Sequence, residues 1–183
     1  MSEQLQTIES MIDTVPDFPK AGINFFDIAP LLLDPKVFKS ANDQMIRQFD
    51  EDEIRETTKI AAFDARGFLF GALIAQAIDV SLVMIRKKGK LPGEIHTVSY
   101  DLEYNSDALE IQHGAFDEKD KVIVVDDVLA TGGTALAGIE LIRSTGAKIV
   151  GFCALIGLED LDGKEKLEAA GVKTHNLIQK RDN

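Results

Sequence analysis

The chain has 183 residues, a length suited to one domain with a sizeable hydrophobic core. Hydrophobic residues make up 45% and charged residues 28%, as in ordinary globular proteins. Acidic residues outnumber basic residues by 31 to 20, and the formal net charge of −11 argues against broad binding to nucleic acid or to an anionic membrane.

A single cysteine, Cys153, excludes an internal disulfide framework and a metal site with several cysteine ligands. It lies in an apolar run, residues 149–156, so we interpret it as a buried small hydrophobic residue, with a catalytic thiol as the alternative. The acidic N-terminus is unlike a signal peptide, and no apolar stretch reaches membrane-spanning length. We therefore expect a cytoplasmic protein with no membrane contact.

The N-terminal part combines a short amphipathic helix with an irregular segment. Apolar residues recur at helical spacing in residues 3–14, and Pro16 and Pro19 end that helix. Residues 18–33 mix apolar residues and turn residues too irregularly for one clean element. A docked arm without ligand contacts is one interpretation of this segment.

A second helix and the first core strand follow. Asp34 and Pro35 predict an N-cap and the first position of a helix that reaches about residue 50. The acidic cluster at residues 50–53 is expected to be a solvated surface turn. Residues 57–63 then predict the first strand of the core.

Arg66 places a full charge at the head of a hydrophobic helix. This helix opens at residues 65–67 and is apolar almost all round as far as Ile78, so it must be covered on most sides. A guanidinium suits pyrophosphate because it can form bidentate hydrogen bonds. The alternative role for Arg66 is a structural salt bridge, such as one to Asp64.

A basic run follows the second predicted strand, residues 80–85. Arg86, Lys87, Lys88 and Lys90 place four positive charges within five residues of an acidic chain. Such runs are usually solvated loops. This one lies at the carboxyl end of a strand, where open α/β sheets bind ligands. We expect it to contact pyrophosphate, either within one subunit or across a dimer interface.

Residues 91–111 are expected to form two extended arms around a mobile tip. The tip, residues 100–107, is polar and aromatic. Long loops inside compact domains are often lids, and a closed lid would exclude water that competes for a reactive centre. A plain exposed hairpin with an acidic tip is the alternative.

The most informative stretch is residues 122–134. Its β-branched start, residues 122–125, predicts a buried strand of a parallel sheet. Asp126 and Asp127 follow where that strand would surface at its carboxyl end. A turn of small residues then leads into an amphipathic helix that Gly146 ends. The turn contains Ala130, Thr131, Gly132, Gly133 and Thr134.

The chemistry of this turn points to a phosphate. Adjacent glycines let backbone N–H groups converge, and the first helical turn adds unpaired donors and the positive end of its dipole. Asp126 and Asp127 repel phosphate but suit the hydroxyls of an attached sugar, or a magnesium ion carried by a second phosphate. These features predict a ribose 5-phosphate site. The lysine of a P-loop and the G-x-G-x-x-G fingerprint are absent, and an ordinary strand–turn–helix connection is the alternative.

Alternating strands and helices predict a doubly wound, mainly parallel α/β sheet with right-handed crossovers. Residues 64–67, 86–90 and 126–134 all follow strands, so we expect them to converge at one edge of that sheet. The remaining predicted elements are a strand at residues 148–158, a helix between Asp162 and Gly171, and a strand at residues 172–178.

The motif D-D-V-L-A-T-G-G-T, from Asp126, resembles the phosphoribosyl pyrophosphate (PRPP) motif of purine phosphoribosyltransferases. Several enzymes and regulators share this motif, so by itself it indicates the ligand. Four further segments are similar to the adenine phosphoribosyltransferase family, and the resemblance reaches about residue 160. They are F-P-K-A-G-I-N-F-F-D-I-A-P-L-L from Phe18, A-R-G-F-L-F-G from Ala65, R-K-K-G-K-L-P-G-E from Arg86 and Y-D-L-E-Y from Tyr100.

The resemblance implies a single domain of the phosphoribosyltransferase type, residues 1–183. Within it we expect a hood at about residues 1–33, a core at about 34–178 and a β-hairpin lid at about 91–111. The resemblance implies that residues 18–33 of the hood cover the base and form part of the dimer contact. The implied reaction belongs to purine salvage and transfers the 5-phosphoribosyl group of PRPP to adenine, giving AMP and pyrophosphate. Mg²⁺ is expected to be carried by PRPP rather than bound directly by the protein, and a homodimer is expected.

The resemblance also implies roles for individual residues. Glu103 matches the catalytic glutamate, and Tyr104 matches the aromatic residue that covers PRPP. The phosphate and ribose are assigned to Asp126, Asp127, Ala130, Thr131, Gly132, Gly133 and Thr134. Pyrophosphate is assigned to Arg66, Arg86, Lys87, Lys90 and Tyr104, and adenine to Asn24, Phe25, Phe26 and Arg66.

Three residues depart from the family pattern. Phe26 stands before Asp27 where arginine is usual, which puts the affinity for the base in question. Asp64 replaces a glutamate, and Asn105 replaces a common glycine. Two rival functions remain: a related enzyme for hypoxanthine, guanine or xanthine, and a PRPP-sensing regulator, which would normally carry an added nucleic-acid-binding module.

Overall fold

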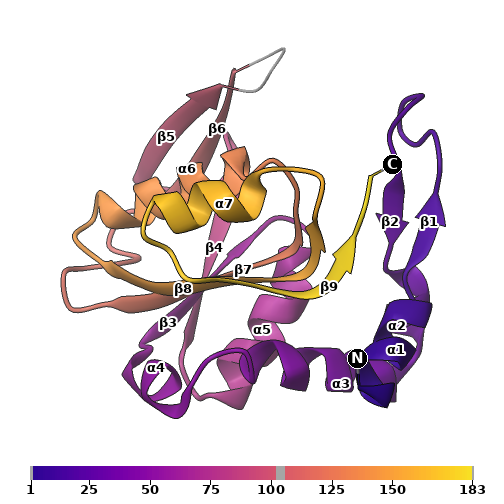
Figure 1. Ribbon diagram of the computed structural model, residues 1–183. Coiled ribbons are helices and arrows are strands. Elements are labelled where there is room, and N and C mark those ends of the chain that lie inside the picture. Colours follow the sequence, from indigo (N-terminus) through magenta and orange to yellow (C-terminus); the bar gives the residue numbers. More distant parts are fainter. Residues whose placement is uncertain (1, 102–105, 183) are drawn as a thin grey trace.

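The computed structural model describes residues 2–101 and 106–182. A seven-stranded sheet forms the centre of the molecule, in the order β5-β6-β4-β3-β7-β8-β9 (Figure 1). Five of its strands run parallel, and the hairpin of β5 and β6 joins β4 in antiparallel fashion. The strands are β3 (Lys59–Phe63), β4 (Ser81–Lys87), β5 (Ile95–Asp101), β6 (Ser106–Gln112), β7 (Lys121–Leu129), β8 (Lys148–Leu158) and β9 (Thr174–Lys180). The predicted mainly parallel α/β sheet is confirmed.

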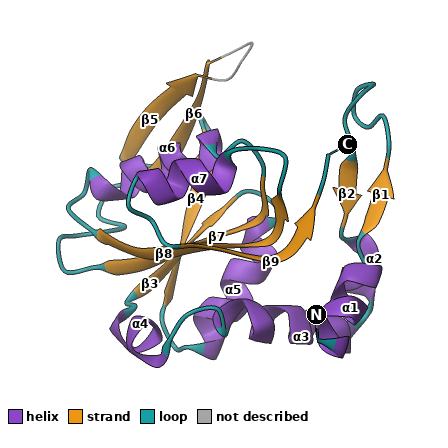
Figure 2. Cartoon of the chain, in the orientation of Figure 1, coloured by secondary structure: helices purple, strands orange, loops and turns teal. Residues whose placement is uncertain are grey.

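Helices cover both faces of this sheet, which makes the fold doubly wound (Figure 2). Along β3 and β7 the side chains alternate between two hydrophobic cores. Ile60 and Val125 face the core that contains α3 and α5, whereas Ala61 and Val124 face the core that contains α6 and α7. Burial on both faces explains the continuous apolar runs of these strands. The helices are α1 (Glu3–Ser10), α2 (Ala29–Leu33), α3 (Pro35–Ile46), α4 (Glu51–Glu56), α5 (Gly67–Ala77), α6 (Gly133–Arg143) and α7 (Gly163–Ala169).

Cys153 lies in β8, between β7 and β9, with 1% of its surface exposed. Burial raises the pKa of its thiol to about 12. The interpretation as a buried hydrophobic residue is therefore confirmed. Among the described residues, no helix combines the length and the apolar character needed to cross a membrane.

The acidic cluster at residues 50–53 is not a turn, and that prediction was wrong. Asp50 is the N-cap of α4, and its side chain accepts a hydrogen bond from the Glu53 backbone, while Glu53 bonds back to the Asp50 backbone. This reciprocal capping box satisfies two backbone donors that the first turn would otherwise leave unpaired. Asp34 caps α3 as expected, through hydrogen bonds from the backbones of Lys36 and Val37.

The irregular N-terminal segment contains a second, smaller sheet. Strand β1 (Asp13–Val15) pairs in antiparallel fashion with β2 (Phe25–Asp27), so the first helix ends earlier than residue 14. In Figure 1 this hairpin stands beside the main sheet, next to the C-terminal end of the chain. Strand β2 leads into α2 and then α3, which connects the hairpin to the core.

Candidate active site

The three motifs that follow strands do meet at one edge of the sheet. Strands β4, β3 and β7 are parallel neighbours, so their carboxyl ends point the same way. Arg66 Nε lies 2.7 Å from Asp127 Oδ2, which joins the motif after β3 to the motif of β7. Arg86 Nε lies 3.4 Å from Asp64 Oδ2, which joins the end of β4 to the end of β3. The predicted convergence is confirmed.

The small-residue turn encloses a cavity of about 140 Å³ in front of α6. Gly132 has φ 79°, in the left-handed region, and caps α6 without a side chain. Loop amides and the open first turn of a helix form a site that favours an anion. The cavity is lined by Asp126, Val128, Leu129, Ala130, Thr131, Gly132, Gly133, Thr134 and Ala135.

Asp126 and Asp127 lie inside strand β7 rather than after it, which corrects the expected strand end at Val125. Strand β3 pairs with β7 only as far as Val125, but β8 continues to pair with it as far as Leu129. The acids therefore keep extended geometry beyond the end of β3. Asp126 Oδ1 accepts a hydrogen bond from the Asp127 backbone at 2.8 Å. Gly67 leaves room for Asp126, because a Cβ at this glycine would lie 2.8 Å from Asp126 Oδ1.

The surroundings of the two aspartates favour their neutral forms. Burial raises the pKa of Asp126 well above its ordinary value, and repulsion by Asp127 adds to the rise. Burial also raises the pKa of Asp127, although the Arg66 guanidinium opposes that rise. A cationic partner would stabilise the ionised forms of two adjacent carboxylates of this kind.

Arg66 pairs with Asp127 and not with Asp64, so the structural alternative named the wrong acid. The contact is a close ion pair that lacks hydrogen-bond alignment. The same guanidinium stacks on the Phe25 ring, 4.8 Å from its centroid, and donates from Nη1 to the Phe26 carbonyl at 3.3 Å. Arg66 therefore connects the acid pair to the N-terminal hairpin.

The basic run has internal counterions. Arg86 pairs with Asp64, and Lys87 Nζ lies 3.2 Å from Asp107 Oδ2. The hydrogen bond to Asp107 raises the pKa of Lys87. Gly89, with φ 78°, donates its backbone N–H at 2.9 Å to Glu110, which is 2% exposed. Glu110 thus holds the turn of the basic loop, a role that no sequence motif indicated.

Comparison with known proteins identifies the family of this site. The sequence model of the family described as the phosphoribosyl transferase domain matches residues 32–181 of this chain. The adenine phosphoribosyltransferase of Rhizobium johnstonii is 42% identical over 179 residues, 98% of each chain. The crystal structure of the Rhodothermus marinus adenine phosphoribosyltransferase superimposes with a TM-score of 0.90 at 41% identity, covering 97% of this chain and 98% of the other.

The chain belongs to the adenine phosphoribosyltransferase family. The predicted enzyme class, transfer of a pentosyl group in purine salvage, is thereby confirmed. The adenine phosphoribosyltransferase of Saccharomyces cerevisiae is also similar, with a TM-score of 0.89 at 35% identity over 97% of this chain and 99% of the other. That structure is a complex with an imino-altritol bisphosphate and adenine.

The residues that the sequence assigns to adenine lie in the N-terminal hairpin or contact it. Phe25 and Phe26 form strand β2, and Phe26 is 5% exposed within the core. The departure at Phe26 is therefore a buried apolar side chain whose backbone carbonyl faces Arg66. Asn24 bonds to Asp182 at the other end of the chain.

The two extended arms expected at residues 91–111 are strands β5 and β6, and this hairpin contacts the phosphate loop through Tyr100. Thr134 Oγ1 donates to the Tyr100 hydroxyl at 3.4 Å, and Tyr100 donates to Asp107 at 3.5 Å. Glu103, Tyr104 and Asn105 lie outside the described residues.

Two residues of α7 support the phosphate loop from behind, and sequence reasoning missed both. Lys166 Nζ donates to the Thr131 carbonyl at 3.0 Å. A Cβ at Gly163 would lie 2.1 Å from the Ala130 carbonyl oxygen, so the loop and α7 approach each other closely. The signal was hidden because α7 follows the loop by about thirty residues and carries no motif of its own.

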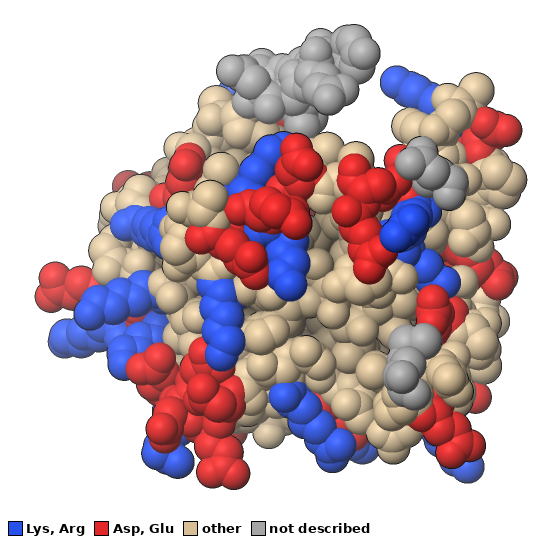
Figure 3. Space-filling model, viewed as in Figure 1, with Lys and Arg blue, Asp and Glu red and all other residues tan. Residues whose placement is uncertain are grey.

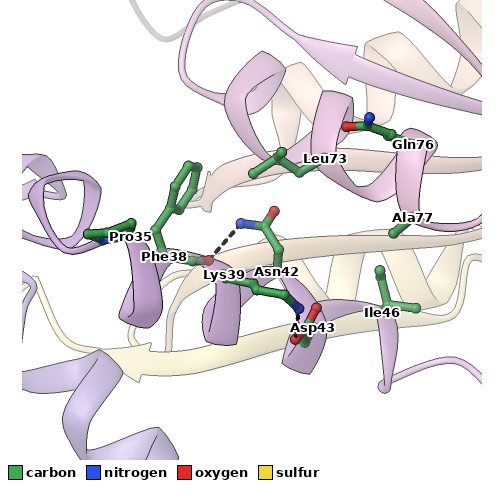
Figure 4. Close-up of a pocket in the computed structure, with 9 residues that line it drawn as sticks. All are labelled: Pro35, Phe38, Lys39, Asn42, Asp43, Ile46, Leu73, Gln76 and Ala77. Carbon is green, nitrogen blue, oxygen red and sulfur yellow. Dashed lines mark hydrogen bonds and ion pairs between the residues drawn. The ribbon is translucent and has the colours of Figure 1, made fainter.

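A second cavity, of about 440 Å³, lies between α3 and α5, away from the strand ends (Figure 4). Its walls are largely apolar, with Phe38 on α3 facing Leu73 on α5. It contains none of the predicted site residues, so we do not assign the reaction to it.

Proposed function

We propose that the site at the carboxyl ends of β3, β4 and β7 binds PRPP and adenine and forms AMP and pyrophosphate. The observation that carries this proposal is the meeting of three groups at one edge: the phosphate loop, the Arg66–Asp127 pair and the basic run. Together they match the three polar parts of PRPP, because its 5-phosphate, its ribose hydroxyls and its pyrophosphate need different partners.

The phosphate loop is proposed to hold the 5-phosphate. Backbone N–H groups of residues 130–134 and the hydroxyls of Thr131 and Thr134 supply its donors. Asp126 and Asp127 are proposed to accept hydrogen bonds from the ribose hydroxyls. Their charge also favours the positive charge that develops on the ribose as its bond to pyrophosphate breaks.

The leaving pyrophosphate is proposed to contact Arg66, Arg86, Lys87 and Lys90, with Tyr104 beside it. A nitrogen of adenine then forms the new bond to the ribose carbon, and the base loses its proton. Glu103 is proposed as the catalytic residue that assists the base or stabilises the ribosyl cation. Phe25, Phe26, Arg66 and the neighbouring Asn24 are proposed to form the adenine side of the site.

We propose Mg²⁺ as the metal and PRPP as its carrier. Mg²⁺ binds oxygen ligands and commonly combines one or two carboxylates with substrate phosphates. Asp126 and Asp127 suit such a PRPP-borne ion without binding it directly, because added positive charge would stabilise their ionised forms. When bound, the metal neutralises pyrophosphate charge as that group leaves.

A homodimer is proposed through the outer face of α5 and β4. Leu69 and Leu73 on α5 and Leu82 and Met84 on β4 are large apolar side chains, each 36% to 43% exposed. Clustered apolar exposure of this kind marks interaction surfaces. Strand β4 pairs with β6 only through Arg86 and Lys87, so its earlier residues keep a free edge. A partner on this face would lie beside the basic run, which begins with Arg86 and Lys87 at the end of β4.

Cytoplasmic location and the absence of nucleic-acid binding remain part of the proposal. PRPP is a polyanion that does not cross membranes unaided, so its enzyme must work where PRPP is made. Acidic and basic side chains are interspersed on the face seen in Figure 3, a distribution unlike a nucleic-acid surface.

Turnover with PRPP and each of adenine, hypoxanthine, guanine and xanthine tests the proposal. We expect AMP from adenine and no nucleotide from the other three bases. Turnover of another base at a similar rate would instead favour the related purine enzymes. PRPP binding without turnover of any base would favour a regulator and overturn the proposed reaction.

A further inference from the structure

The last described residues of the chain reach back to its N-terminal hairpin. Asp182 donates its backbone N–H to the Asp160 carboxylate, at 3.1 and 3.0 Å from the two oxygens. Asp182 Oδ1 accepts a hydrogen bond from the Asn24 backbone at 3.2 Å. The Asp182 carbonyl accepts a second one from the Asn24 side-chain amide. Figure 1 shows the C-terminal end beside β2, in agreement with these contacts.

The residues before Asp182 anchor this segment to the rest of the molecule. Lys180 Nζ lies 3.2 Å from a carboxylate oxygen of Glu9 on α1. Arg181 Nε lies 3.2 Å from Glu159, in the turn after β8. The segment Lys180–Asp182 is thus held on the core side by β9, α1 and residues 159–160, and it contacts the hairpin through Asp182.

The hairpin needs such a tether because it buries little surface of its own. Its sheet has two strands, and all three residues of β1 are exposed. A two-stranded hairpin is marginally stable in water unless it packs on something else. Phe26 supplies packing from β2, and Asn24, immediately before β2, supplies the tether to Asp182.

Asn24 is also close in sequence to the groups that contact Arg66. Phe25 stacks on the guanidinium, and the Phe26 carbonyl accepts a hydrogen bond from it. A shift of Asn24 would move both groups, because they are the next two residues of one short strand. The hydrogen bonds between Asp182 and Asn24 therefore affect the geometry around Arg66 indirectly, through Phe25 and Phe26.

We propose that Asp182 is a positioning residue for the base side of the active site. It acts through Asn24, whose backbone N–H and side-chain amide both donate to Asp182. The inference rests on the proposed function, which places adenine at the N-terminal hairpin. It assigns to the end of the chain a part in substrate affinity that no motif of the family indicated.

The variant Asp182→Ala tests this directly in the full-length enzyme. We expect the KM for adenine to rise about three- to tenfold, the effect of one lost hydrogen bond, with kcat and the KM for PRPP unchanged. Asp182→Asn keeps an oxygen acceptor at the same position and should restore most of the affinity. Asp52→Ala is the control, because it removes an exposed aspartate on α4 that pairs with Arg55 and has no part in the Asn24 contact.

The outcomes separate this inference from the proposed function. An unchanged KM for adenine in Asp182→Ala, or an equal rise for adenine and PRPP, would overturn the positioning role. Should the native enzyme not use adenine, the proposed function fails on its own. Hydrogen exchange of residues 17–26 then still decides whether the tether exists, because Asp182→Ala must accelerate it relative to Asp52→Ala.

Discussion

Arg66 Nε lies 2.7 Å from Asp127 Oδ2, so the cation at the head of α5 neutralises an acid near the end of β7. The two residues are proposed to bind different parts of PRPP, pyrophosphate and ribose. When PRPP binds, Arg66 would pair with pyrophosphate instead of Asp127. Asp127 would then accept hydrogen bonds from the ribose hydroxyls. The pair therefore keeps the site balanced in charge before the substrate arrives.

We expect Arg66→Met to lower the free energy of unfolding by about 1–3 kcal/mol, because it leaves the Asp127 carboxylate unpaired. The loss is smaller than for a fully buried pair, since the Arg66 side chain is 35% exposed. Denaturant unfolding measures the effect. The double variant Arg66→Met/Asp127→Asn should recover most of the stability and none of the activity. Equal stability of Arg66→Met and native protein would contradict the role of this ion pair.

Asp126→Asn is expected to stabilise the fold and to abolish most of the activity. The folded pKa of Asp126 is raised, so the native state holds a proton that the unfolded chain releases. Stability therefore falls as pH rises from about 3.8 through the folded pKa. The substitution removes that slope and should add about 0.5–2 kcal/mol at neutral pH. Unfolding across a pH series checks this, with Asp43→Asn on the surface of α3 as the control.

The pH dependence of activity should depend on the carboxylates of Asp126 and Asp127. The proposed reaction needs ionised Asp126 and Asp127, and both have raised pKa values. We expect the acid limb of the pH profile of kcat/KM to lie above the ordinary aspartate value of 3.8. An acid limb at or below that value would mean that neither carboxylate limits the reaction.

Two lysines of α7 allow a matched comparison of the phosphate loop. Lys166 bonds to the Thr131 carbonyl, whereas Lys164 pairs with Glu168 on the solvent side, at 3.8 Å. We expect Lys166→Met to raise the KM for PRPP about three- to tenfold, because the loop loses a support. Lys164→Met should leave it unchanged. Initial rates at varied PRPP decide the matter, and identical behaviour of the two variants would exclude a role for Lys166.

Met84→Asp is expected to dissociate the proposed homodimer, because it places a charge in the apolar face of α5 and β4. Sedimentation would show a species of half the native mass. Ala169→Asp is the control, since Ala169 is exposed at the end of α7, which packs on the other face of the sheet from α5. A monomeric native protein, or a Met84→Asp variant that stays dimeric, would rule out this interface.

The sequence was sufficient for the core because local and global signals agree there. Residues 148–158 were predicted as a strand and form β8 over that whole span. The apolar runs, the turn glycines and the N-cap at Asp34 each have short-range causes. The same holds for the phosphate loop, whose chemistry is contained in consecutive residues.

What the sequence did not reveal depends on contacts between distant residues. The partner of Arg66 was misassigned because Asp64 is near in sequence, while Asp127 is near only through the pairing of β3 with β7. Strand β7 continues beyond its predicted end at Val125 because β8 pairs with it as far as Leu129. No pattern within β7 indicates this pairing. Glu110, Lys166 and Asp182 likewise act on segments that only the fold brings to them. By contrast, the capping box of Asp50 and Glu53 is a local pattern and was misread as a solvated turn.

The burial of Cys153 has a practical consequence for following the enzyme at work. Its thiol is shielded in the sheet, so the folded protein already behaves as a scaffold without accessible sulfhydryls. A cysteine introduced at the exposed Ser99, on the arm of the hairpin, would then be the one group available to a fluorescent or spin label. The variant Ser99→Cys could thus carry a single reporter on this hairpin without mutation of Cys153.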